Sequence, residues 1–379
     1  MKNRALLYSA FLLLPLLAGC GDEYSLEKFS VSHEASYQLW DNFDYGNLKV
    51  VYDETELEKN QYDVDFSEFD AGKVGESKIA VSLRKSPKIS VALPIQITHR
   101  ASCNLLCVGS SLVGEAISYA NELLKNTDGA SGVHVYAAVS DEASLDDLYA
   151  SFARGDASYS FLSYDSETSS WTESEGKTLK EILSGEISFD AVCLSEENAK
   201  AGKKESFSNL SRFALSLSSF YASLGKNAPS LGYLMPWSYE DKAAVDPSYY
   251  EDYGNDGNVM YQAIADVCRE NVASSGHFNF VLPVGTAIQN ARENGFITLK
   301  DFTADGKSLD LTYGRYLASL CLVAKLTGHG ASYFSYRGES GSELLTEEEK
   351  SLFDGFVDAA VSNPYQVTKE EKQDSESQE

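Results

Sequence analysis

The sequence predicts an α/β domain with a parallel sheet, preceded by a small all-β domain and a signal segment. Residues 27–99 contain short segments in which every second side chain is apolar, which is typical of strands with one buried face. Residues 103–364 alternate apolar, strand-like runs with longer helical patterns, which is typical of parallel sheets covered by helices. The first 20 residues begin with cations and continue as an apolar run that ends at a cysteine.

The N-terminal segment resembles the signals of bacterial lipoproteins. Lys2 and Arg4 precede an apolar run, and Leu17-Ala18-Gly19-Cys20 matches the lipobox, whose cysteine is acylated and becomes the new N-terminus. The run is shorter than the roughly 20 residues that span a bilayer. We therefore expect residues 1–19 to be removed, Cys20 to carry a lipid, residues 20–26 to form a linker, and the protein to lie outside the cytoplasm on a membrane surface. The alternative is an ordinary signal peptide with an incidental cysteine.

Charge and cysteine content narrow the possible partners. The net charge of −26 argues against nucleic acid, because phosphates require a basic face. Five cysteines remain after Cys20, an odd number with no CxxC pair, so we expect buried free thiols, no metal site and no cofactor. A disulfide between Cys103 and Cys107 is the alternative. We expect a monomer.

Residues 27–99 predict a β-sandwich. Residues 89–97 alternate apolar and polar side chains, as do the residues around Val81, and the Ser86-Pro87 turn separates the two segments. The order of segments 48–52, 62–65 and 69–75 resembles bacterial immunoglobulin-like surface domains. That resemblance implies a spacer or adhesive stalk.

The second region predicts βαβ units with helices on both faces of a parallel sheet. The expected strands are 104–108, 133–139, 189–194, 231–235 and 278–283, and the expected helices are 112–124, 145–153, 207–224, 259–272 and 313–326. Residues 365–379 are rich in Glu, Gln, Ser and Lys, and predict a disordered tail.

A serine follows the first of these strands. Gly109-Ser110-Ser111 lies between the strand and the next helix, and ligands of open parallel sheets bind beyond the carboxyl ends of the strands. A serine at such a turn is exposed, which suits a nucleophile. The alternative is a helix N-cap, for which serine is also a preferred residue.

This region resembles the SGNH branch of the GDSL hydrolases, within it an uncharacterised branch found in bacterial surface lipoproteins. The resemblance covers most of residues 103–330 and implies a flavodoxin-like sheet. Blocks in matching order carry it: 108–112, 179–183, 189–194, 234–239, 260–264, 283–292, 305–309 and 314–318.

The resemblance implies a catalytic serine, histidine and aspartate. Ser111 falls on the nucleophile and Asp305 on the acid, while Gly109 and Ser110 fall beside the oxyanion site. The family pattern places the histidine three residues after the aspartate, where this chain has Ser308. Ser110 replaces the family's asparagine, and Ser195 replaces a glutamine.

Three histidines of this region could replace the missing base, although each is more typical of a structural role: His134, His277 and His329. His277 is expected at the amino end of a strand, on the opposite edge of the sheet. His33 and His99 belong to the first region and its junction.

Ser195, Trp237 and Tyr239 are expected to contact the ligand. The acidic, Tyr-rich segment 239–258 that follows them is either a glycan-contacting loop or a solvated insertion. The sequence thus leaves three hypotheses: a serine esterase or deacetylase of acylated glycans, an inactive relative that binds a glycan or protein, and a structural surface protein.

Overall fold

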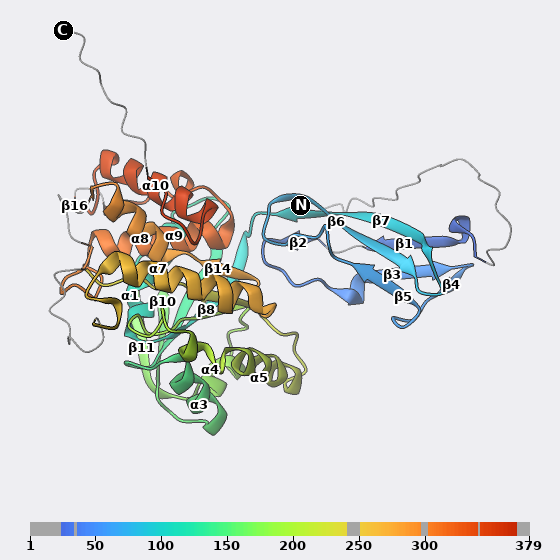
Figure 1. The fold of residues 1–379 in the computed structure, drawn as a ribbon, viewed down its shortest axis with the longest axis horizontal. Helices are drawn as coiled ribbons and strands as arrows, with labels where there is room; N and C mark the ends of the chain where they lie inside the picture. Colours follow the sequence, from blue (N-terminus) through green and yellow to red (C-terminus); the bar gives the residue numbers. More distant parts are fainter. Residues whose placement is uncertain (1–23, 34–35, 241–250, 297–301, 340–341, 370–379) are drawn as a thin grey trace, which may run out of the picture. The chain divides into compact units, whose positions relative to one another are not determined.

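A computed structural model describes residues 24–33, 36–240, 251–296, 302–339 and 342–369. The chain divides into two compact units, residues 1–99 and 100–379 (Figure 1). The expected signal segment and Cys20 lie outside the described residues. Among the described helices, none has the length and apolar character needed to cross a membrane.

The first unit is built from two sheets. One has the strand order β1-β3-β4 and the other the order β2-β7-β6-β5. Their bounds are β1 (Phe29–His33), β2 (Tyr37–Gln38), β3 (Leu48–Tyr52), β4 (Thr55–Glu56), β5 (Tyr62–Asp65), β6 (Gly75–Leu83) and β7 (Ser86–Thr98), with short 3-10 turns at Leu26–Lys28 and Tyr45–Asn47. Ile79, Val81 and Leu83 of β6 are buried at alternate positions, as the sequence period requires. The unit is β-rich as expected, and its immunoglobulin-like character stays a prediction.

The second unit contains one seven-stranded sheet in the order β11-β10-β9-β8-β12-β13-β14. The strands are β8 (Ser102–Gly109), β9 (Gly132–Val139), β10 (Tyr159–Asp165), β11 (Ser170–Lys177), β12 (Ala191–Leu194), β13 (Ser230–Leu234) and β14 (Phe280–Leu282). β9, β8, β12, β13 and β14 are parallel, which confirms the five predicted strands. β10 and β11 are antiparallel, so the sheet is mixed rather than wholly parallel.

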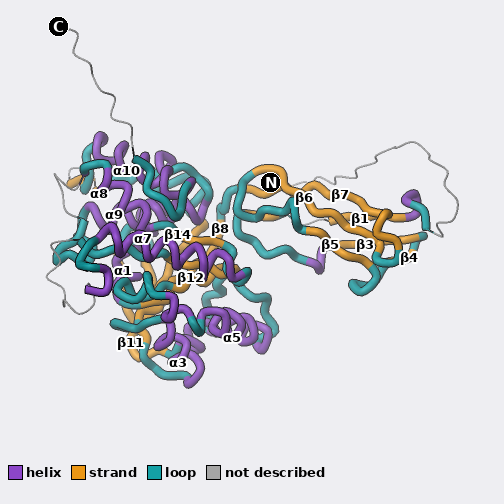
Figure 2. The backbone as a smooth tube through the Cα atoms, in the orientation of Figure 1, coloured by secondary structure: helices purple, strands orange, loops and turns teal. Residues whose placement is uncertain are grey.

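Helices cover both faces of this sheet, as predicted (Figures 1 and 2). α3, α4, α5 and α7 pack on one face through the main hydrophobic core, and α1, α2, α8 and α9 lie on the other with α10 outside them. The bounds are α1 (Ser111–Ala116), α2 (Ala120–Lys125), α3 (Leu145–Arg154), α4 (Leu179–Ser184), α5 (Leu210–Ser223), α7 (Gly257–Val267), α8 (Val284–Glu293), α9 (Tyr313–Thr327) and α10 (Glu347–Ser362). Shorter elements are the 3-10 turns Lys204–Phe207, Glu251–Tyr253, Ala273–Ser275 and Ala331–Tyr333, a π-helical turn Cys268–Val272, and the strand pair β15 (Gly338–Glu339) and β16 (Ser342–Glu343).

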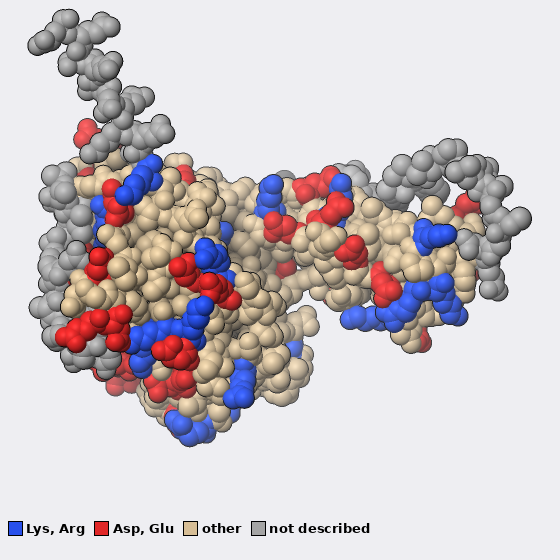
Figure 3. Space-filling view, viewed as in Figure 1, with Lys and Arg blue, Asp and Glu red and all other residues tan. Residues whose placement is uncertain are grey.

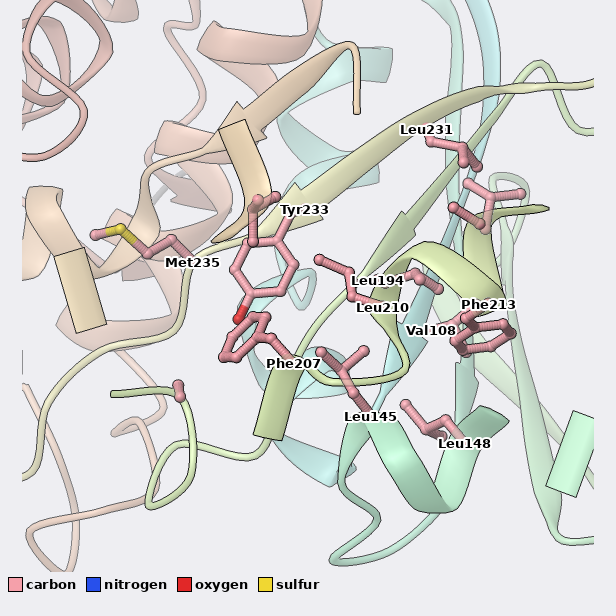
Figure 4. Packing of buried hydrophobic residues seen from close by; sticks show 14 of the residues in the cluster. Val108, Leu145, Leu148, Leu194, Phe207, Leu210, Phe213, Leu231, Tyr233 and Met235 are labelled. Carbon is pink, nitrogen blue, oxygen red and sulfur yellow. The ribbon is translucent and has the colours of Figure 1, made fainter. Parts of the chain in front are cut away.

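The core explains why the central strands are apolar on both faces. Val108 of β8 and Leu194 of β12 pack with Phe207, Leu145 and Tyr233 on the α3/α5 side (Figure 4). The neighbouring Cys107 and Cys193 are also fully buried and face each other in register across the two strands. All five cysteines after Cys20 are buried free thiols, as expected.

Two predicted boundaries are wrong. The helix expected over 112–124 is two helices, α1 and α2, with a break at residues 117–119. The disordered tail was expected from residue 365, but residues 365–369 are packed: the backbone N–H of Thr368 donates to Oδ1 of Asn290 at 2.9 Å, and Tyr365 packs against the core. Residues 370–379 lie outside the described residues.

Candidate functional site

The sheet topology places the candidate site at the carboxyl ends of β8 and β12. The chain leaves β8 towards β9 on one side, whereas β12 lies on the other side of β8 and continues to β13. Such a reversal opens a crevice between two neighbouring strand ends, where ligands of open α/β sheets bind. Gly109-Ser110-Ser111 and Ser195-Glu196-Glu197 are the two turns that meet there.

Gly109 allows these turns to approach each other closely. A Cβ atom on Gly109 would lie 2.5 Å from Cγ2 of Val113 and 3.2 Å from Cβ of Ser195. Its carbonyl accepts a hydrogen bond from the N–H of Ser140 at 2.9 Å. The structure therefore gives Gly109, expected beside the oxyanion, a packing role.

The two serines after Gly109 differ in accessibility. Ser110 is the N-cap of α1, is 3% exposed and makes no side-chain hydrogen bond to the helix. Ser111 is the first helical residue, and its side chain is exposed. Within the described part of the chain, its hydroxyl makes no hydrogen bond. Ser111 is thus placed as an accessible nucleophile would be.

The loop that carries Asp305 and Ser308 lies beside α1. The N–H of Leu309 donates to Oε2 of Glu115 at 2.7 Å, and Glu115 is one helical turn after Ser111. Nε1 of Trp237 donates to the carbonyl of Lys307 at 2.7 Å, which ties the loop to the segment after β13. The structure therefore brings the elements bearing the predicted serine and aspartate to the same edge of the sheet.

Asp305 is engaged within its own loop. Its Oδ1 accepts the N–H groups of Lys307 at 2.8 Å and Ser308 at 2.6 Å, and its Oδ2 accepts the Ser308 hydroxyl at 3.2 Å. Partial burial raises the pKa of Asp305, but these hydrogen bonds outweigh it and lower the pKa overall. The aspartate is ionised at neutral pH and caps a turn. Ser308, at the expected histidine position, has a hydroxyl that is no base near pH 7.

The histidines of the second unit lie at the opposite, amino edge. His134 pairs with Asn104, five residues or roughly 16 Å before the carboxyl end of β9. His277 precedes β14, and His329 stacks on Tyr333 at 3.8 Å between ring centroids. The Tyr333 hydroxyl donates to the carbonyl of Asp128, just before β9. None of these imidazoles is therefore placed to activate Ser111.

A buried polar cluster joins three loops of the site. Oε1 of Glu197 accepts the Tyr239 hydroxyl at 3.3 Å and lies 3.5 Å from Nζ of Lys307. Oε2 of Glu197 accepts the N–H of Ala199 at 2.9 Å. Burial, and then the Glu197 charge, raise the pKa of the Tyr239 hydroxyl. The cluster fixes the segments after β12 and β13 against the 305–309 loop.

Three residues expected to contact a ligand are buried supports instead. The side chain of Trp237 is fully buried and Tyr239 is 1% exposed, so neither ring presents a face for stacking. Ser195 is 3% exposed, and its hydroxyl donates to the carbonyl of Leu234 at 3.1 Å. These residues position the loops. The expected glycan-contacting segment 239–258 includes residues 241–250, which lie outside the described residues.

Sequence reasoning missed Glu196, which follows Ser195. Glu196 is 1% exposed, and its Oε1 accepts the N–H groups of Leu145 at 3.1 Å and Glu197 at 2.8 Å. Burial raises the pKa of Glu196 to about 8, although the two N–H groups and the charge of Lys200 lower it. The available signal was a pair of glutamates directly after a strand expected in the centre of a parallel sheet.

A metal site was not expected from the sequence, and the side chains that could bind a metal ion bear on that point. Among the described residues, no group of three or more His, Cys, Asp or Glu side chains could hold a metal ion.

Comparisons with known proteins support the fold. Residues 186–348 match the family model described as "Domain of unknown function (DUF4886)". A crystal structure of a DUF4886 family protein from Bacteroides uniformis aligns with 70% of this chain and 97% of its own, at 22% identity and a TM-score of 0.61. The second unit therefore has a mixed α/β fold that is also found in that protein. No curated protein matches the sequence.

Two further solved structures carry names that include an activity. A protein from Slackia heliotrinireducens, provisionally assigned as an SGNH hydrolase, aligns with 59% of this chain and 99% of its own, at 18% identity and a TM-score of 0.38. A catalytic mutant of an acetylxylan esterase from Geobacillus stearothermophilus aligns with 66% of this chain and 100% of its own, at 14% identity and a TM-score of 0.33. Similarities at TM-scores below 0.5 do not establish a shared activity.

Proposed function

We propose that this chain is a lipid-anchored surface protein that binds a neutral, hydroxyl-rich ligand such as an acylated glycan. The binding site is of the serine-hydrolase type and has lost its catalytic base. The observation that carries this proposal is Ser308, which occupies the expected histidine position and hydrogen-bonds Asp305, while the histidines of the second unit lie at the opposite edge of the sheet. Without a base, a serine hydroxyl is a weak nucleophile.

The charges of the site favour a neutral ligand. Lys307 is paired with Glu197, and Arg315 lies 3.8 Å from Glu115. An anionic ligand would have to break one of these pairs, whereas hydroxyl groups can donate to the carboxylates that are already present. On the face of the second unit seen in Figure 3, basic side chains also lie next to acidic ones.

Binding can be tested by titrating acetylated and deacetylated xylan oligosaccharides into the full-length protein and measuring heat. We expect saturable binding that weakens at least about tenfold when Lys307→Glu places a like charge beside Glu197. Lys226→Glu, on a lysine outside this site, is the matched control and should bind as the natural protein does. Absence of binding to every neutral glycan tested would contradict the proposal.

A working serine esterase is the second candidate. The exposed Ser111 and the retained, ionised Asp305 favour it. An active esterase would need a base that the described residues do not provide at this edge. This second hypothesis predicts hydrolysis of a simple acetyl ester that disappears in Ser111→Ala.

The membrane anchor is a separate part of the proposal. A lipid on Cys20 would hold the protein at the membrane surface, because acyl chains contribute about 0.8 kcal/mol for each buried CH₂ group. Cells grown with an alkyne fatty acid should label the natural protein but not Cys20→Ser. Equal labelling of the two proteins would exclude this anchor.

A further inference from the structure

Glu196 is a buried carboxyl group in the loop that supports the candidate site. It follows β12 directly and precedes Glu197, which pairs with Lys307. Oε1 accepts two backbone N–H groups, from Leu145 at 3.1 Å and from Glu197 at 2.8 Å. Leu145 is the first residue of α3, so this carboxyl group ties the 195–201 loop to the start of that helix.

The second carboxyl oxygen of Glu196, Oε2, has an unusual environment. Oε2 is buried and has no hydrogen-bond partner among the described residues. An ionised carboxylate in such a place would leave a charged oxygen without a donor, which costs far more than burial of a neutral acid. Burial of this oxygen therefore favours the protonated form. The two N–H groups at Oε1 favour the ionised form, but burial outweighs them.

The groups that face Glu196 do not compensate a negative charge. In its own loop, Glu197 adds a like charge, while Lys200 has the opposite charge but forms no ion pair with Glu196 among the described residues. From β13, the buried Tyr233 hydroxyl lies close to Glu196, and burial raises the pKa of Tyr233 well above its usual range, so this neighbour adds no positive charge.

The helix that Glu196 caps is also acidic at its start. Asp147 belongs to the capping box that Ser144 forms at the start of α3, and Lys200 lies near enough to lower the pKa of Asp147. The positive charge of Lys200 therefore acts on two carboxyl groups at once, those of Asp147 and Glu196.

We infer that Glu196 is a pH-sensitive latch. Protonated, it holds the 195–201 loop to the start of α3, and its ionisation in alkaline solution releases this loop and loosens the Glu197–Lys307 side of the site. Ionisation transfers one proton to solvent and makes or breaks no other covalent bond. The released loop would take water to the Glu196 oxygens. The effect on ligand binding rests on the proposed function, whereas the latch itself does not.

Hydrogen exchange of the full-length protein tests the latch without any ligand. After correction for the intrinsic pH dependence of exchange, peptides covering 141–150 and 195–201 should lose protection at least about tenfold between pH 7 and pH 9.5. While Glu196 is protonated only in the closed form, each pH unit shifts the opening equilibrium about tenfold. Glu196→Gln, which cannot ionise, should show no such loss. The exposed Glu186→Gln is the matched control and should behave as the natural protein does.

A second measurement detects the protonation state of Glu196 directly. Infrared difference spectroscopy at pH 7 should show a protonated carboxyl group in the natural protein that is missing in Glu196→Gln. A pH-independent protection pattern in the natural protein, or absence of that infrared band, would overturn the latch. Failure to bind any glycan would affect only the proposed function.

Discussion

The backbone N–H of Leu309 donates to Oε2 of Glu115 at 2.7 Å, and this hydrogen bond joins the loop of Asp305 to the helix of Ser111. Glu115 is mostly buried, and its other oxygen lies 3.8 Å from Arg315. Two segments almost 200 residues apart in the chain thus meet through one carboxyl group. The 305–309 loop is placed by this contact, by Trp237 and by the Glu197–Lys307 pair, whereas the described hydrogen bonds of Asp305 stay within the loop.

Replacing Glu115 should therefore loosen the loop. Glu115→Ala removes the acceptor of the Leu309 N–H and should lower the free energy of unfolding by about 1–3 kcal/mol, because a buried donor is left unpaired. Glu115→Gln keeps an acceptor oxygen and should lose less. Urea denaturation of the three proteins checks this, and an alanine variant as stable as the natural protein would show that the contact does not hold the loop.

Gly109 should not tolerate a side chain. The added methyl group of Gly109→Ala would meet Val113 at 2.5 Å in a packed turn, and overpacking of this kind costs about 1–3 kcal/mol. Gly355 in α10 is the matched control, because a Cβ there meets nothing within 4 Å. Gly355→Ala should stabilise the protein by roughly 0.5–1 kcal/mol, since alanine is the better helix former. Thermal unfolding that shifts both variants in the same direction would contradict this account.

Stability should decrease as the pH rises through the neutral range. The pKa of Glu196 is about 8 in the folded protein against a reference of 4.5, so the folded state holds more protons than the unfolded chain between these values. The contribution of Glu196 is fully present below about pH 4.5 and is lost as the pH approaches 8, by at most about 5 kcal/mol. Urea denaturation from pH 5 to pH 8.5 measures this effect. The free energy of unfolding of the natural protein minus that of Glu196→Gln should fall as the pH rises. A difference that does not vary with pH would show that Glu196 is ionised in the fold.

The sequence predicted the parts of the fold that local patterns determine. The strands β12, β13 and β14 are buried along their whole length, and the structure has all five parallel strands at the expected places. The hairpin β10–β11 was missed because β11 is polar and exposed along most of its length, so no buried period marks it. The expected helix over 112–124 breaks because the hydroxyl of Ser319 in α9 accepts a hydrogen bond from the N–H of Tyr119 and donates one to the carbonyl of Ala116. Such a tertiary contact leaves no local signal.

The candidate site was predictable only in part, for a similar reason. Ser111 follows a strand of a parallel sheet, so its position at the carboxyl edge could be expected. Asp305 and Ser308 were found through the family pattern, and the structure places their loop beside α1. Trp237 and Tyr239 were expected to contact a ligand because aromatic residues beside carboxylates and amides can stack on a sugar. Burial decides their role instead, and burial of a loop residue depends on distant segments. Glu196 and Glu197 are adjacent residues of the same type. Only the packing of the folded chain gives them different surroundings, a buried carboxyl group for Glu196 and an ion pair with Lys307 for Glu197.

The most direct test of the central claim is hydrolysis of 4-nitrophenyl acetate by four full-length proteins: the natural chain, Ser111→Ala, Ser308→His and the double variant. The account predicts that the natural chain and Ser111→Ala do not exceed background. Ser308→His should gain at least about tenfold hydrolysis because it restores a base beside Asp305, and the double variant should lose that gain. Hydrolysis by the natural chain that disappears in Ser111→Ala would contradict the account and identify a working serine esterase.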